Sequence, residues 1–129
     1  MSEPILAAAR RYADAWRTGD IAALFACYHD EFTLHYGGAN PLSGDHIGKP
    51  AALAALAEVT RRTQRRLVEI IDVTAGEARA VIIAREHFTR DGREDNFVRV
   101  LVYTVKDDLL AECWVYDQDQ ALVDWYLRD

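Results

Sequence analysis

Cysteine is scarce in this chain of 129 residues, which contains only two, Cys27 and Cys113. Their separation is not that of metal ligands, so we expect free, buried thiols in a reducing cytoplasm. The chain also lacks an apolar run of the roughly 20 residues needed to cross a bilayer. Its first residues do not resemble a secretory signal. The sequence therefore predicts a cytoplasmic protein without a membrane partner.

Positive charge is also in deficit, with 15 Lys and Arg against 21 Asp and Glu and a formal net charge of −6. An acidic surface repels phosphate backbones, so nucleic acid is not an expected partner. Residues 61–66 contain four arginines, which we interpret as a solvated helix end stabilised by the helix dipole, with anion binding as the alternative. Metal-spaced His or Cys sets, phosphate-binding glycine loops and serine nucleophile motifs are missing too.

Half of the residues are hydrophobic, which is enough for one core, and we expect a single domain over residues 1–129. Apolar residues recur at helical spacing over residues 4–18. Gly19 is a good terminator for this helix, and Asp20 can cap a second, shorter helix. A third helix is expected to begin near Pro50 and to end in the arginine cluster.

The second half of the chain is rich in β-forming residues. Asp91 and Gly92 predict a tight hairpin, because a type I′ turn needs a positive φ at both central residues. The expected strands are residues 32–36, 67–74, 78–90, 96–106 and 109–117. Helices that precede an antiparallel meander imply an α+β domain rather than alternating βαβ units. We expect a curved antiparallel sheet wrapped by the N-terminal helices around a pocket.

Several segments resemble one known family. They are residues 12–20 (YADAWRTGD), 40–49 (NPLSGDHIGK), 90–93 (RDGR) and 109–114 (LLAECW). They resemble nuclear transport factor 2-like domains, and within them the SnoaL-like group, relatives of ketosteroid isomerases and polyketide cyclases. The resemblance implies a cone-like, cystatin-like roll with a pocket for a small hydrophobic ligand. It also implies a homodimer through the outer sheet face and no metal or organic cofactor.

The resemblance limits the reaction. In ketosteroid isomerases a helix-one tyrosine and a protonated aspartic acid stabilise an enolate, while a strand-one aspartate moves the proton. Tyr12 matches the tyrosine. The base position falls on Tyr36, or at best on His35, and the second acid falls near Leu101. Two of the three roles are therefore lost, which argues against steroid isomerisation by that mechanism.

Charged residues interrupt one apolar strand. Arg85, Glu86 and His87 are consecutive, so alternation lets either Glu86 or its two neighbours face the pocket. Counting back from the hairpin turn favours Glu86, and ion pairing on the outer face is the alternative. Limonene-type epoxide hydrolases use an Asp-Arg-Asp set on the later strands, with which Arg85 and Asp117 invite comparison.

The candidate site residues form two groups. We assign catalysis to Tyr12, which would polarise a ligand oxygen, and to Tyr36 and Glu86, which would relay a proton. The candidate ligand-binding residues are Trp16, His35, His46, His87, Leu101, Tyr103, Trp114 and Asp117. Core packing, helix capping or surface pairing is the alternative for most of them. The predicted function is a cofactor-independent acid–base enzyme of isomerase, cyclase or hydrolase type, and the alternative is a non-catalytic ligand-binding or scaffold dimer.

Overall fold

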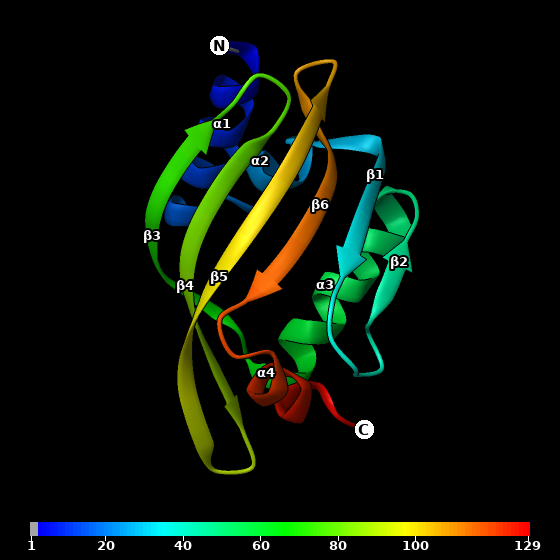
Figure 1. Ribbon diagram of the computed structural model, residues 1–129, viewed down its shortest axis with the longest axis vertical. Coiled ribbons are helices and arrows are strands. Elements are labelled where there is room, and N and C mark those ends of the chain that lie inside the picture. The colour runs from blue at the N-terminus through cyan, green and yellow to red at the C-terminus, as the bar shows by residue number, and fades with distance from the viewer. Residues whose placement is uncertain (1–2) are drawn as a thin grey trace.

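The computed structural model describes residues 3–129, which form a six-stranded sheet and four helices (Figure 1). The helices are α1 (Glu3–Thr18), α2 (Ile21–Ala26), α3 (Lys49–Thr63) and α4 (Gln120–Leu127). The strands are β1 (Tyr28–Tyr36), β2 (Gly44–His46), β3 (Arg66–Ala75), β4 (Ala80–Arg90), β5 (Arg93–Lys106) and β6 (Leu109–Asp117). Three helices precede the meander β3–β6, so the α+β prediction is confirmed. Within the described chain, no helix combines the length and hydrophobicity that a membrane span requires.

The sheet is mixed rather than wholly antiparallel. Its strand order is β2-β1-β6-β5-β4-β3. Every neighbouring pair is antiparallel except β1 and β6, which run parallel. Parallel neighbours need a long connection, and here α3 and the strands β2, β3, β4 and β5 lie between them in the chain. The predicted antiparallel pairing therefore holds for the meander β3–β6, whereas β1 runs parallel to its neighbour β6.

The first strand and the following loop differ from the prediction. The strand begins at Tyr28 rather than at residue 32, because α2 ends at Ala26 and the carbonyl of Cys27 already accepts from Leu110 N at 2.9 Å. The turn-rich segment after β1 contains the short strand β2, which pairs Leu34 with His46. Tyr28, two residues after the end of α2, therefore belongs to the sheet.

The predicted turn and cap chemistry is present. Asp91 and Gly92 have φ values of 52° and 78°, as a type I′ turn requires. Asp20 caps α2, since its Oδ1 accepts from Ala23 N at 3.1 Å. Cys27 and Cys113 are free and buried, as expected. The cytoplasmic location that we based on them remains a prediction.

Side-chain alternation divides the sheet into two faces. Helices α1, α2 and α3 lie on one side, and Figure 1 views the sheet from the other. The inward residues of β4 are almost fully buried, from Ala80 to Phe88 in steps of two. The helix α4 packs Tyr126 against the inward Phe88 and Phe97, with ring centroids 5.7 and 5.5 Å apart. The core therefore lies between the helices and the inner face.

Candidate functional site

A cavity of about 330 Å³ lies between the inner face of the sheet and helices α1, α2 and α3. Most of its wall is apolar or aromatic, and α2 contributes Ile21, Leu24 and Phe25. Among the described residues that line it, the charged ones are Arg65, Glu86 and Arg99. An apolar cavity with a few convergent polar groups is typical of a small-molecule site.

Arg99 is the centre of the polar end of this cavity. Its side chain is 1% exposed. Nε and Nη2 donate to the two carboxylate oxygens of Asp117 at 2.6 and 3.1 Å. Nη1 donates to Glu86 Oε2 at 3.2 Å, and Nη2 also donates to the Tyr36 hydroxyl at 2.6 Å. The sheet register creates this cluster, because Arg99 is directly opposite Asp117, and Glu86 is opposite Phe97, the preceding inward residue of β5.

Glu86 keeps one oxygen out of this network. Its side chain is 1% exposed, yet within residues 3–129 Oε1 has no hydrogen-bond partner. Arg65 Nη1 lies 3.5 Å from that oxygen, close enough for an ion pair. Arg65 is brought there by the turn between α3 and β3, where Gln64 adopts the left-handed region at φ 49°. A buried carboxylate oxygen with no donor costs free energy, so this atom is suited to meet a ligand.

The Tyr36 hydroxyl can donate a hydrogen bond to a ligand. Burial raises the pKa of Tyr36 above its ordinary value, so the phenol keeps its proton near neutral pH. Its oxygen accepts from Arg99, and its own hydrogen has no acceptor in the described part of the chain. Burial alone would lower the pKa of Arg99, but Tyr36, Asp117 and Glu86 hold that pKa well above its usual value. The site thus combines a protonated phenol, a fixed cation and a carboxylate acceptor.

A tyrosine cluster lines another part of the wall. The Tyr12 and Tyr28 hydroxyls share a hydrogen bond of 2.7 Å, and the ring of Tyr103 lies 5.7 Å from that of Tyr12. Burial raises the pKa of Tyr12 to about 12, so this hydroxyl also stays protonated. Each hydroxyl carries one hydrogen, and the shared hydrogen bond uses only one of the two. The pair can therefore donate to a ligand oxygen.

The structure brings about half of the predicted site residues to the cavity. Those that line it are Tyr12, Trp16, Tyr36, Glu86, Leu101 and Tyr103. Asp117 supports Arg99 without lining the cavity itself. The others, which are His35, His46, His87 and Trp114, lie outside it. Alternation explains most of the division, because Tyr36 and Glu86 point inward and their neighbours in the strand point outward.

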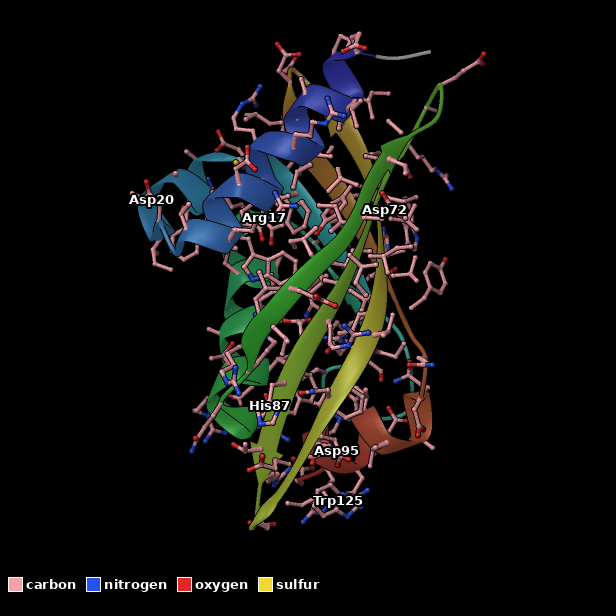
Figure 2. All side chains as sticks on the ribbon, turned by 90° about the vertical axis from the view of Figure 1, so that its left-hand side faces the viewer. Arg17, Asp20, Asp72, His87, Asp95 and Trp125 are labelled. Carbon is pink, nitrogen blue, oxygen red and sulfur yellow. The ribbon has the colours of Figure 1, made fainter. Side chains whose placement is uncertain are left out.

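The outward residues have structural partners. His35 bonds Asp45 through Nδ1 at 2.8 Å and Glu112 through Nε2 at 2.9 Å, and its ring stacks on Trp114 with centroids 4.6 Å apart. His87 pairs with Asn96 Oδ1 at 2.6 Å. Figure 2 shows His87 on β4, far along the sheet from the corner between α1 and α2. These contacts tie strands together on the outer face.

Two further side chains also lie away from the cavity. His46 belongs to β2, where Nε2 bonds the carbonyl of Leu42 at 2.7 Å, away from the cavity. Arg85 also points outward and pairs with Glu69. The arginine that accompanies Asp117 is therefore Arg99 rather than Arg85.

Three of the polar residues described above were not predicted as site residues from the sequence, namely Arg99, Arg65 and Tyr28. Arg99 carried a usable signal, because it alternates in step with Phe97, Leu101 and Tyr103 on an otherwise apolar face. A charge in that position must be paired inside the core. For Arg65 and Tyr28 we find no comparable sequence signal. In the described residues, no group of three or more His, Cys, Asp and Glu side chains is arranged to hold a metal ion.

Comparisons with known structures support the same fold. Bal32a, from a soil-derived mobile gene cassette, is 22% identical, with 98% of each chain covered and a TM-score of 0.86. A cystatin-like protein of unknown function from Xanthomonas campestris is 20% identical, with 97% of this chain and 98% of that chain covered and a TM-score of 0.88. TerC, co-crystallised with polyporic acid, is 17% identical, with 96% and 98% covered and a TM-score of 0.79. At these identities the likeness shows the fold alone.

The family is shown by the sequence itself. No functionally curated protein matches the chain. The sequence profile of the SnoaL-like domain matches residues 9–113, which include the larger part of α1, the helices α2 and α3, the first five strands and the first part of β6. The resemblance noted from the sequence is thus confirmed, and the chain belongs to the SnoaL-like domain family.

Proposed function

We propose that this protein is a cofactor-independent acid–base enzyme that acts on a small hydrophobic molecule. One observation carries the proposal: Glu86 Oε1 is buried, has no hydrogen-bond partner within residues 3–129, and belongs to a side chain that lines the cavity. Such an oxygen is costly unless it serves a ligand or a proton transfer. The Tyr36 hydroxyl lines the same cavity and supplies the complementary donor.

In this mechanism Glu86 is the base. It accepts a proton from a C–H or O–H group of the substrate, or from water. Tyr36 donates a hydrogen bond to the substrate oxygen on which negative charge develops. In an isomerase or cyclase the proton then returns to another substrate atom, and in a hydrolase it goes to the oxygen of the bond that breaks. Arg99 is a positioning residue, because it holds both Glu86 and Tyr36 without itself moving a proton.

The tyrosine pair supplies a second donor in the same cavity. Tyr12 and Tyr28 leave one hydroxyl hydrogen for a ligand oxygen. Leu101 also lines the wall and cannot act as the second acid of a ketosteroid isomerase. The donor set therefore supports a proton transfer that differs from steroid isomerisation.

The family supports a small organic ligand. SnoaL-like domains are a small-molecule-binding family. The co-crystal of TerC with polyporic acid concerns that protein, and by likeness of fold it favours a small organic molecule for the present chain as well. The apolar wall favours a ligand that is mostly hydrophobic.

Proton transfer can be tested before the natural substrate is known. The protein is incubated in D₂O with 2-tetralone, and exchange of the protons next to the carbonyl is followed by NMR. A parallel assay follows hydration of cyclohexene oxide. We expect turnover in at least one assay and its loss in Glu86→Gln, by a factor of about 10² to 10⁴. The matched control is Glu69→Gln, which changes the exposed partner of Arg85 and should retain the rate. Equal rates in the two variants would overturn the assignment of Glu86.

A non-catalytic binding protein is the second candidate. It is favoured because Arg99 donates hydrogen bonds to both carboxylate oxygens of Asp117 and to one of Glu86. Few carboxylate oxygens of the site are then left to accept a proton from a substrate. This alternative predicts that a ligand raises the melting temperature without being consumed. Consumption that depends on Glu86 would exclude it.

We also infer a homodimer through the outer face of the sheet. The outward residues of β5 and β6 include Val100, Val102, Trp114 and Tyr116, and the Tyr116 side chain is exposed. Among the described elements, α1, α2 and α3 all lie against the opposite face (Figure 1). Sedimentation equilibrium should give twice the chain mass, and Val100→Glu should give the monomer mass. A monomeric parent protein would contradict this inference.

A further inference from the structure

Two polar side chains face each other in the cavity without forming a hydrogen bond. Arg65 Nη1 and Glu86 Oε1 are 3.5 Å apart, and Oε1 has no donor within residues 3–129. Over the same residues, Arg65 makes one hydrogen bond, from Nε to Thr60 Oγ1 at 3.3 Å. Both side chains line the cavity. Arg65 thus has N–H groups, and Glu86 an oxygen, that can still form hydrogen bonds to one ligand.

The chemistry of these two groups restricts what can bridge them. A guanidinium only donates hydrogen bonds, and an ionised carboxylate only accepts them. A bridging group must therefore accept from Arg65 and donate to Glu86. A hydroxyl does both, whereas an ether or ketone oxygen can only accept. A ligand carboxylate would also meet Glu86 as a like charge.

The formal charges at the polar end of the cavity also favour a neutral ligand group. The formal charges of Arg65 and Arg99 cancel those of Glu86 and Asp117. An ionic ligand group would leave this enclosed end with an uncompensated charge, which is expensive to bury. A neutral group that makes both hydrogen bonds carries no such cost.

The rest of the cavity determines the body of the ligand. Trp16, Leu24, Phe32, Leu53 and Leu101 all line it. Aromatic and branched apolar side chains on facing walls favour a flat or compact hydrocarbon frame. The hydroxyl therefore has to be carried on an apolar body.

We infer that the ligand is a neutral, hydroxyl-bearing hydrophobic compound whose hydroxyl bridges Arg65 and Glu86, accepting from the first and donating to the second. Arg65 is then a ligand-binding residue, and Glu86 selects a hydroxyl over an ether. The inference rests on the proposed function, because it places the substrate in the same cavity. It adds the chemical class of the ligand and a residue that selects it. It concerns binding and does not depend on which proton is moved.

Three related probes test this class. They are 2-naphthol, 2-methoxynaphthalene and 2-naphthoate, which share one frame and differ in the polar group. Binding is measured by NMR titration of the intact protein. We expect 2-naphthol to bind about ten- to a hundredfold more tightly than the ether or the carboxylate, since one hydrogen bond to a charged group is lost in each case.

The role of Arg65 is tested by substitution. Arg65→Met keeps an unbranched side chain but removes the donors, so 2-naphthol and the ether should both bind about tenfold more weakly. Glu86→Met removes the acceptor, so the preference for 2-naphthol over the ether should fall to about twofold or less. Arg65→Lys should retain an intermediate affinity for both probes because one donor group remains. The matched control is Arg61→Met, which changes an exposed arginine paired with Glu58 and should leave all three affinities unchanged. Circular dichroism verifies that each variant is folded.

The outcomes separate this inference from the proposed function. If the parent protein binds all three probes equally, no hydroxyl bridges Arg65 and Glu86; the inference is overturned and the cavity remains a binding site. If Arg65→Met leaves the affinity for 2-naphthol unchanged, Arg65 does not bind the hydroxyl. If Glu86→Met keeps the full preference, Glu86 is not the selecting residue. If no probe binds, both the ligand class and the use of this cavity are overturned.

Discussion

Arg99 donates from Nη2 to the hydroxyl of Tyr36 over 2.6 Å, although 63 residues separate them in the chain. The same guanidinium holds Glu86 and Asp117. One buried cation on β5 thus unites a phenol and two carboxylates from three other strands at the end of an apolar cavity. Its removal should affect both the stability of the fold and the geometry of the site.

Arg99→Met should strongly destabilise the protein, because it leaves Glu86 and Asp117 buried without their partner. Breaking a buried ion pair in this way costs about 3–5 kcal/mol. Urea unfolding measures the change, and Arg85→Met on the outer face should cost no more than about 1 kcal/mol. Adding Glu86→Leu and Asp117→Leu should recover much of the loss, since an apolar replacement of the whole set is often tolerated. Similar effects of Arg99→Met and Arg85→Met would contradict the central role of Arg99.

The stability of the outer face should depend on pH through His35. Burial lowers the pKa of His35, but the hydrogen bonds to Asp45 and Glu112 outweigh it, and the net pKa is raised above the ordinary value of 6.5. Because this pKa is higher in the folded chain, the stabilisation is fully present below the unfolded pKa. It is lost as the pH rises through the folded pKa.

This pH dependence can be measured in two ways. NMR titration should show His35 with a raised pKa, and Asp45→Asn should move that pKa back toward the ordinary value. The difference in unfolding free energy between the parent protein and His35→Gln should shrink between about pH 5 and pH 9. Thr33→Ala, on the same face of β1, is the control and should give a difference that does not change with pH. A parent His35 that titrates below its ordinary value would refute the prediction.

Gly38→Ala should cost more than a comparable change at Gly44. Both glycines have positive φ, 88° and 117°, so alanine is strained at either. A Cβ at Gly38 would also press on Gln120 and Asp124, whereas one at Gly44 meets nothing within 4 Å. Asp124 cannot move freely, because Oδ1 accepts from Asn40 Nδ2 at 2.8 Å. Thermal or urea unfolding should show an additional cost of about 1–3 kcal/mol for Gly38→Ala, and equal costs would argue against this crowding.

Both thiols should react slowly in the native protein. Burial raises the pKa of Cys113 to about 12 and also raises the pKa of Cys27. Since the thiolate is the reactive form, a disulfide reagent such as DTNB should modify them slowly near pH 8. Both should react at once in guanidinium chloride. Rapid modification of a full thiol equivalent in the native state would show that the cavity beside Cys113 is more open than described.

Local sequence signals predicted local structure well. The turn at Asp91 and Gly92 depends on backbone angles that few residues adopt, and the cap at Asp20 depends on a bond to the next turn of helix. The order of helices and strands indicated the pocket, the family resemblance supplied Tyr12 and Tyr36, and counting back from the hairpin turn supplied Glu86. These features depend on neighbours in the chain or on a shared pattern.

The other features of the fold and the site depend on contacts between residues far apart in the chain, which no local sequence pattern predicts. The start of β1 at Tyr28 is set by pairing with β6, more than 80 residues later in the chain. Arg99 is a site residue because the register places it opposite Asp117, and that register was not known beforehand. His35 and Trp114 looked like pocket residues by type, but the direction of their side chains sends them to the outer face.

The parallel pairing of β1 with β6 also has a consequence for the order of folding. Arg99 and Asp117 lie on adjacent strands of one hairpin and are 18 residues apart, so this pair can form early. Tyr36 joins them only when the first strand docks against the last, and closing such a long loop slows folding. In a refolding experiment the meander should therefore regain its structure before the cavity can bind a ligand. Functional recovery would report the final docking step rather than the formation of the sheet.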